Sequence, residues 1–174
     1  MAKRQRRPVQ SDAPQDPLSN YDPTDYDDAL ERSLCEDDLR DIMSHPAITA
    51  TPDTATREVV NTLHDRAVAC VIIVDDGRPV GILTERDVLN YAAAGWDDVK
   101  DKPVSGVMTR DPVTLHDSDT PARALNAMAS GGIRHIPVTD IDGKLVGMIG
   151  IRRITRYLQQ HLSEAADPNA SGEA

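Results

Sequence analysis

Two stretches of the chain pass from a short apolar segment directly into a helical pattern. Residues 80–89 (VGILTERDVL) begin with an apolar run typical of a buried strand, and Thr84 then opens a helix. Residues 146–154 (VGMIGIRRI) repeat this order further along the chain. Each stretch is preceded by another apolar segment, residues 68–75 or residues 133–140, which ends at a turn rich in Asp and Gly. The chain is therefore predicted to contain two copies of one unit of roughly 60 residues.

Each copy is predicted to contain a short strand, a helix, two strands joined by a tight turn, and a second helix. The first helix of each copy corresponds to the helical pattern at residues 54–63 or at residues 119–128. Residues 69–74 are almost continuously apolar, so we expect both faces of this strand to be buried. Because one unit is too small to cover its own sheet, the two units should pack against each other. The predicted fold class is α/β, built from two β-α-β-β-α repeats.

The two repeats are expected at residues 38–95 and 105–162, with residues 96–104 as the linker between them. Residues 1–37 are polar and contain several prolines, an acidic cluster and a basic start, which is typical of a disordered tail. Residues 163–174 are mostly small and polar and are predicted to form a second disordered tail. Both tails are expected to be dispensable for folding.

Composition narrows the class of protein. Hydrophobic residues make up 39% of the chain, and with no Phe and one Trp the core must be aliphatic. No apolar run approaches the roughly 18 residues of a membrane span, and the basic start lacks the apolar region of a secretory signal. The two cysteines, Cys35 and Cys70, have no spacing typical of a metal or redox pair. We therefore expect a cytoplasmic protein without a membrane partner or a bound metal.

Charge and the lack of catalytic motifs argue against two further classes of protein, nucleic-acid-binding proteins and enzymes. The net charge of −10 lies mostly in the predicted tails, because the segment between them is nearly neutral. The four cations near the N-terminus lack interleaved aromatic residues, so nucleic acid is not the expected partner. The sequence shows no nucleophile beside a base, no metal-ligating cluster and no glycine-rich phosphate loop, so an enzyme is not expected.

The junction at Thr84 carries the main candidate chemistry. A Thr followed three residues later by an acid, here Asp87, is the arrangement of a capping box, in which each side chain satisfies a free amide at the helix start. A strand that runs straight into a helix also presents unpaired N–H groups and a positive dipole end, which suit an anion such as phosphate. From the residues alone, the two side chains either cap the helix or take part in ligand binding.

The paired pattern resembles a tandem cystathionine-β-synthase (CBS) domain pair, or Bateman module. The resemblance rests on residues 81–87 (GILTERD), residues 133–138 (IRHIPV) and their counterparts, and it covers essentially all of the chain outside the tails. It implies a pseudo-twofold arrangement of the repeats with the sheets facing a central cleft. It also implies frequent association of two pairs, and regulatory binding of AMP, ADP, ATP or S-adenosylmethionine rather than a required cofactor.

The resemblance also implies roles for individual residues. The Asp87 carboxylate would accept hydrogen bonds from ribose hydroxyls, and the Thr84 hydroxyl would face ribose or phosphate. Ile133 would pack on the adenine and Arg134 would bind phosphate. His135 would either face phosphate or pack as a strand histidine. The nucleotide-binding residues predicted in this way are Ile82, Thr84, Asp87, Thr109, Thr114, Ile133, Arg134 and His135.

The second cleft departs from the family pattern. Gly150 stands at the place of Thr84, and Arg153 stands at the place of Asp87. A cation accepts no hydrogen bond from ribose hydroxyls, so ordinary nucleoside binding is not expected there. Arg152 and Arg153 either hold a polyphosphate or an acidic partner, or are solvated charges. The residues assigned to this second, degenerate cleft are Ser44, Thr49, Val68, Cys70, Gly150 and Arg153.

The leading hypothesis is a regulatory module that binds an adenosine-containing ligand between the repeats and signals to an effector protein that the sequence does not identify. The alternative is a dimerisation or adaptor module without a ligand, in which Thr84 and Asp87 serve only as caps. A homodimer of pairs is expected because the second helix of each repeat carries an apolar face at helical spacing. These faces comprise Val88, Leu89 and Ala92 in one helix and Ile154, Tyr157 and Leu158 in the other.

Overall fold

The computed structural model describes residue 26 and residues 29–166, which form a mixed α/β fold with two small sheets. The first half of the described chain contains α1 (Ala29–Glu36), α2 (Leu39–Ile42), β1 (Thr49–Ala50), α3 (Thr56–Asp65), β2 (Cys70–Asp75), β3 (Arg78–Thr84) and α4 (Glu85–Val99). The second half contains the 3₁₀ turn η1 (Val104–Gly106), β4 (Thr109–Arg110), β5 (Leu115–His116), α5 (Pro121–Gly131), β6 (His135–Thr139), β7 (Leu145–Gly150) and α6 (Ile151–Ala166).

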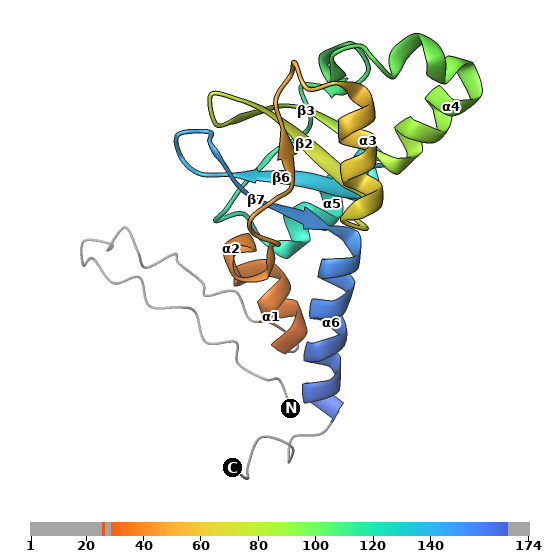
Figure 1. The fold of residues 1–174 in the computed structure, drawn as a ribbon. Helices are drawn as coiled ribbons and strands as arrows, with labels where there is room; N and C mark the ends of the chain where they lie inside the picture. Colours follow the sequence, from red (N-terminus) through yellow and green to blue (C-terminus); the bar gives the residue numbers. More distant parts are fainter. Residues whose placement is uncertain (1–25, 27–28, 167–174) are drawn as a thin grey trace, which may run out of the picture.

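Each repeat is built around one antiparallel hairpin, as the sequence predicts. The first sheet has the order β1-β2-β3-β4, with β1 parallel to β2 and the β2–β3 hairpin at its centre. The second sheet has the order β5-β6-β7, with β5 parallel to β6 and the β6–β7 hairpin beside it. Figure 1 shows the two hairpins one above the other, with α4 at one end of the molecule and α6 extending from the other. The α/β class and its two repeats are confirmed.

The two repeats exchange their first segments. Strand β4 lies at the start of the second repeat but pairs with β3 of the first, with Thr109 opposite Ile82. Ser44 lies near the start of the first repeat but forms a bridge with Met148 in β7, through backbone N–H···O bonds of 2.9 and 3.0 Å. The last strand of each repeat therefore pairs with chain from the other repeat.

Glycines in β3 and β7 permit this exchange. A Cβ atom on Gly81 would overlap the side chain of Met108, and a Cβ atom on Gly147 would overlap Met43. The two methionines immediately precede the exchanged segments, so their side chains pack where the glycines leave room. The same Met–Gly contact therefore occurs twice, each time between a methionine of one repeat and a glycine of the other.

Two clusters of buried aliphatic side chains form the core. In β2 the residues Cys70–Ile73 are all buried, which confirms that both faces of this strand are covered. The first cluster comprises Val59, Leu63, Val71, Ile73, Leu83, Val104 and Val107. The second comprises Leu39, Ile42, Met43, Leu115, Ala124, Met128, Ile136, Val138, Ile149, Ile154 and Tyr157.

The predicted disordered tail at residues 1–37 is wrong for residues 29–37. Helix α1 packs against α5 and α6, and the Tyr157 hydroxyl donates a hydrogen bond to the Asp37 carboxylate. Burial, together with this hydrogen bond, raises the pKa of Tyr157 to about 12. The rest of the predicted tail, residues 1–28, lies outside the described part of the chain except for residue 26.

Two other boundaries also differ from the prediction. Helix α6 continues to Ala166, so the second tail does not begin at residue 163, and residues 167–174 lie outside the described part. Helix α4 continues to Val99 across a kink at Gly95, where φ is 144° and ψ is 72°. The expected linker at residues 96–104 is therefore helical over its first part, because only a glycine adopts such a φ readily and the helix resumes after it.

The apolar face predicted for dimerisation on the last helix is wrong. Ile154 is fully buried and Tyr157 is 8% exposed, because both belong to the core of the second repeat and lie beneath α1. Helical periodicity identifies an apolar face but not the element that covers it. Within the described residues, no helix is long and apolar enough to cross a membrane.

Candidate functional site

The start of α4 is held by the predicted capping box. The carboxylate Oδ2 of Asp87 accepts hydrogen bonds from the Thr84 backbone N–H at 2.9 Å and from its hydroxyl at 2.6 Å. Thr84 Oγ1 in turn accepts a hydrogen bond from the Asp87 N–H at 3.4 Å. Within the described residues the other carboxylate oxygen, Oδ1, has no hydrogen-bond partner. Asp87 therefore caps the helix with one oxygen and keeps the second available as an acceptor.

A cavity of about 240 Å³ lies beside this capping box and is called the Asp87 cavity below. It collects seven of the eight residues predicted to bind nucleotide: Ile82, Thr84, Asp87, Thr109, Ile133, Arg134 and His135. Thr109 reaches the cavity because β4 pairs with β3 across from Ile82. The eighth, Thr114, is exposed directly before β5 and does not line the cavity.

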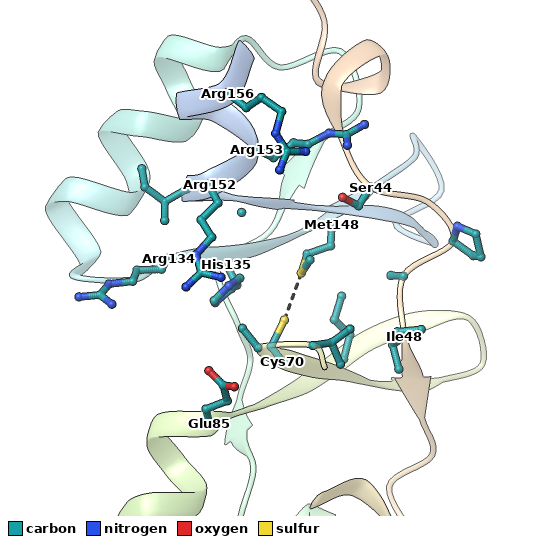
Figure 2. Close-up of a pocket in the computed structure, with 17 residues that line it drawn as sticks. Ser44, Ile48, Cys70, Glu85, Arg134, His135, Met148, Arg152, Arg153 and Arg156 are labelled. Atoms are coloured by element: carbon teal, nitrogen blue, oxygen red, sulfur yellow. Dashed lines mark hydrogen bonds between the residues drawn. The ribbon is translucent and has the colours of Figure 1, made fainter. Parts of the chain in front are cut away.

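A larger cavity of about 570 Å³ corresponds to the second cleft and is called the arginine cavity below. Figure 2 shows four arginine side chains around it, three of them from the first two turns of α6. Of the residues predicted for this cleft, Ser44, Val68, Cys70, Gly150 and Arg153 line the cavity, whereas Thr49 is exposed on β1 and does not.

Sequence reasoning missed several residues of the arginine cavity. Arg156 lies three positions after Arg153 on the same face of α6, so helical spacing was the signal for it. Met148 and Glu85 also line the cavity. Met148 carried no signal in the sequence, because its position follows from the packing of the two sheets.

The cavity floor is apolar and contains a sulfur contact. Cys70 Sγ donates to Met148 Sδ at 3.1 Å across the interface between the two sheets (Figure 2). Burial, with a smaller contribution from the carboxylate of Glu85, raises the pKa of the Cys70 thiol to about 12. Cys70 therefore remains a protonated thiol and acts as a packing residue rather than a nucleophile.

In the part of the chain that the structure describes, the arginines of the cavity form no ion pairs. Within the described residues, neither Arg134 nor the three arginines of α6 forms an ion pair. Arg153 is held by a 2.7 Å hydrogen bond from its Nε to the carbonyl oxygen of Ile42. Burial lowers the pKa of His135; Glu85 opposes this effect, whereas Arg152 and Arg134 add to it. His135 is therefore neutral at neutral pH, and the positive charge of the cavity comes from guanidinium groups.

The two repeats match one family twice. A profile described as the CBS domain matches residues 39–94 and 104–160, which together make up more than half of the chain. The chain belongs to the CBS domain family. The two matched ranges are separated by residues 95–103, and both cavities are lined by residues of both CBS domains.

Curated relatives match this chain over 62–70% of its length. An uncharacterized 17.7 kDa protein of Acidianus ambivalens is 32% identical over 108 residues, which cover 62% of this chain and 64% of the relative. An inosine-5′-monophosphate dehydrogenase of Methanocaldococcus jannaschii is 28% identical over 117 residues, but these are only 22% of the enzyme. The chain thus spans less than two thirds of the length of these relatives, and the similarity to the dehydrogenase concerns a small part of it.

Solved structures of CBS domain pairs have the same fold. The CBS domain pair of protein MJ0100, in complex with 5′-methylthioadenosine and S-adenosyl-L-methionine, aligns with a TM-score of 0.63 at 28% identity, covering 69% of this chain and 98% of that one. The CBS domain protein PAE2072 from Pyrobaculum aerophilum, complexed with AMP, aligns with a TM-score of 0.63 at 26% identity, covering 71% and 98%. Relatives with this fold bind adenosine-containing ligands.

Proposed function

We propose that this CBS domain pair is a regulatory module that binds an adenosine-containing ligand in the Asp87 cavity and signals to a partner protein. One observation carries the proposal: seven residues assigned from the sequence, from both repeats, line a single cavity. The complexes of similar CBS pairs with AMP and with S-adenosyl-L-methionine support the ligand class.

The chemistry of the cavity suits a nucleoside. Oδ1 of Asp87 accepts a hydrogen bond from a ribose hydroxyl while Oδ2 keeps its capping bonds. Ile82 and Ile133 supply apolar surface for the base, and Arg134 supplies charge for a first phosphate. Asp87 belongs to one repeat and Arg134 to the other, so a bound ligand contacts both. It therefore favours one relative arrangement of the repeats, which is the requirement for a signal.

The test is a calorimetric titration of the Asp87→Ala variant with AMP, ATP and S-adenosylmethionine. Loss of one hydrogen bond to a charged acceptor should weaken binding by roughly 10- to 150-fold. The matched control is Asp98→Ala, which removes an exposed carboxylate from the same helix outside the cavity. If Asp87→Ala binds every ligand as tightly as the parent, Asp87 is only a cap and the adaptor function replaces the sensor.

We also propose that two pairs associate through α4. Leu89 is 70% exposed on this helix, whereas the apolar face of α6 is already covered within the chain. Sedimentation should show a dimer that Leu89→Asp shifts towards the monomer, with Leu162→Asp, at a 54% exposed site on α6, as the control. A parent protein that remains monomeric at micromolar concentration would contradict this interface.

A further inference from the structure

The two cavities share a wall. Ala69, Glu85, Arg134 and His135 line both the Asp87 cavity and the arginine cavity. The Asp87 cavity, at about 240 Å³, falls below the range of roughly 300–1,000 Å³ of ordinary ligand pockets, whereas the arginine cavity falls within it. A ligand too long for the first cavity would have the second cavity directly beyond this shared wall.

The charges on the two sides of this wall differ. In the Asp87 cavity, Glu85 and Asp87 balance Arg86 and Arg134, so its lining is neutral. The arginine cavity is lined by four arginines and one carboxylate, so its lining carries a net charge of +3 while His135 is neutral. The arginine cavity therefore attracts anions more strongly than the Asp87 cavity does.

The four arginines repel one another, and the described residues offer them no ion pair that would offset this repulsion. Arg152 extends towards His135 and Glu85, the Arg134 guanidinium points away from His135, and Arg153 and Arg156 lie together on the side of Ser44 (Figure 2). The first turn of α6 contains no acidic residue, although a helix start carries a positive partial charge of its own. Within the described residues none of the four has an ion-pair partner. An anion bound among them would relieve this repulsion.

We infer that the ligand is an adenosine oligophosphate, with its nucleoside in the Asp87 cavity and its phosphate chain passing Arg134 into the arginine cavity. This inference rests on the proposed function and narrows its ligand class to nucleotides with more than one phosphate. Adenosine fills the neutral cavity alone, and a single phosphate reaches only the shared wall. The second and third phosphates meet Arg152 and the other guanidinium groups of α6, which form strong charge-assisted hydrogen bonds with phosphate.

The test is a calorimetric series of adenosine, AMP, ADP and ATP on the full chain in the presence of EDTA. Affinity should rise with phosphate number, with ATP bound roughly 10-fold or more tightly than AMP and one ATP per chain. The Arg152→Ala variant should lose most of the difference between ATP and AMP while its affinity for adenosine stays unchanged. Arg123→Ala, which removes an exposed arginine of α5 outside both cavities, should behave like the parent.

The thermal midpoint of the Arg152→Ala variant shows whether a loss of affinity reflects a binding defect or a folding defect. Removing a cation from the first turn of α6 should leave the thermal midpoint unchanged or raise it, because cations are unfavourable at a helix start. If Arg152→Ala nevertheless unfolds, Glu85→Gln supplies the second measurement. It removes the one carboxylate of the arginine cavity and should increase the affinity for ATP more than that for adenosine.

Three results would overturn the inference while leaving the sensor function intact. These are equal affinities for AMP and ATP, two ATP molecules bound per chain, and tripolyphosphate binding without competition against ATP. The last two would show that the arginine cavity is a separate anion site. Failure of every adenosine compound, adenosine included, would instead contradict the proposed function itself.

Discussion

The two helices that follow the last strand of each repeat begin in opposite ways. Helix α4 begins after Thr84 with a complete capping box and has Glu85 and Asp87 in its first turn. Helix α6 begins after Gly150 with Arg152 and Arg153 and has no acidic residue in its first turn. On the proposed function, the few residues after the last strand of each repeat would determine whether its cleft accepts hydroxyl groups or attracts anions.

The two helices also depend on different interactions for their stability. The start of α4 is satisfied locally, by side chains three residues apart. Helix α6 instead relies on tertiary packing, with Ile154 and Tyr157 in the core and α1 packed alongside. Tertiary burial makes an electrostatically unfavourable helix start tolerable, and this leaves the arginines free for another role.

The largest expected effect on stability comes from removing α1, the helix that packs against α6. A chain that begins at residue 38 lacks α1, which packs against α5 and α6 and carries the half-buried Leu30 and Leu34. We expect a loss of about 2 kcal/mol in the free energy of unfolding, measured by urea denaturation. Arg32→Ala, in an exposed ion pair of the same helix, should change it by less than about 0.5 kcal/mol. If the truncated chain keeps the urea midpoint of the parent, the boundary predicted at residue 37 between tail and folded domain would be correct for stability.

The next effect comes from removing the support of α4. The Thr84→Val substitution keeps the shape of the side chain but removes the acceptor for the Asp87 N–H and one donor to its carboxylate. Loss of this cap should destabilise the protein by about 1 kcal/mol in thermal or denaturant unfolding. Thr155→Val on α6, where the hydroxyl donates only to a carbonyl within the helix, is the control and should cost much less.

A smaller effect of opposite sign is expected from giving α6 an acidic start. Arg152→Glu places a carboxylate at the positive end of the helix and beside the remaining arginines. Stability should rise by about 0.3–1 kcal/mol at low ionic strength, and the gain should shrink in high salt. A gain that persists in molar salt would show that electrostatics is not its origin.

The pH dependence should be the most gradual effect. Because the pKa of His135 is lowered in the folded protein, the unfolded chain binds the proton first as pH falls below about 6.5. The stabilisation is therefore complete above that pH and is lost as pH falls towards the folded-state pKa. The urea midpoint of the parent protein should fall between pH 7.5 and pH 5.5. The fall should be smaller in the His135→Gln variant. His64→Gln, at an exposed position on α3, should keep it.

Local features of the fold and site were predictable because their causes are local. The capping box follows from Thr84 and Asp87 at helical spacing, and the buried strand β2 follows from its continuous apolar run. The repeat of these local patterns then led to the family and to seven of the residues that line one cavity. Each of these inferences depends on residues close together in the chain or on a pattern that occurs twice.

The features that were missed depend on which distant segments meet. The apolar face at Ile154 and Tyr157 is visible as a helical pattern, but nothing in it indicates that α1 covers it. Leu30 and Leu34 are spaced for a helix but lie in an acidic, proline-containing region that resembles a disordered tail. Thr114 was assigned to the Asp87 cavity together with Thr109, but only Thr109, on the strand β4 that pairs with β3, reaches it.

The exchange of leading segments also limits how the chain can be divided. Separating the repeats would break the Thr109–Ile82 pairing and the two backbone hydrogen bonds between Ser44 and Met148. Without the second half the first sheet loses β4, and without the first half β7 loses its bridge to Ser44, so we expect the pair rather than the single repeat to be the smallest unit that folds. Two half-chains produced separately would act as complementing fragments, each supplying the missing edge of the other.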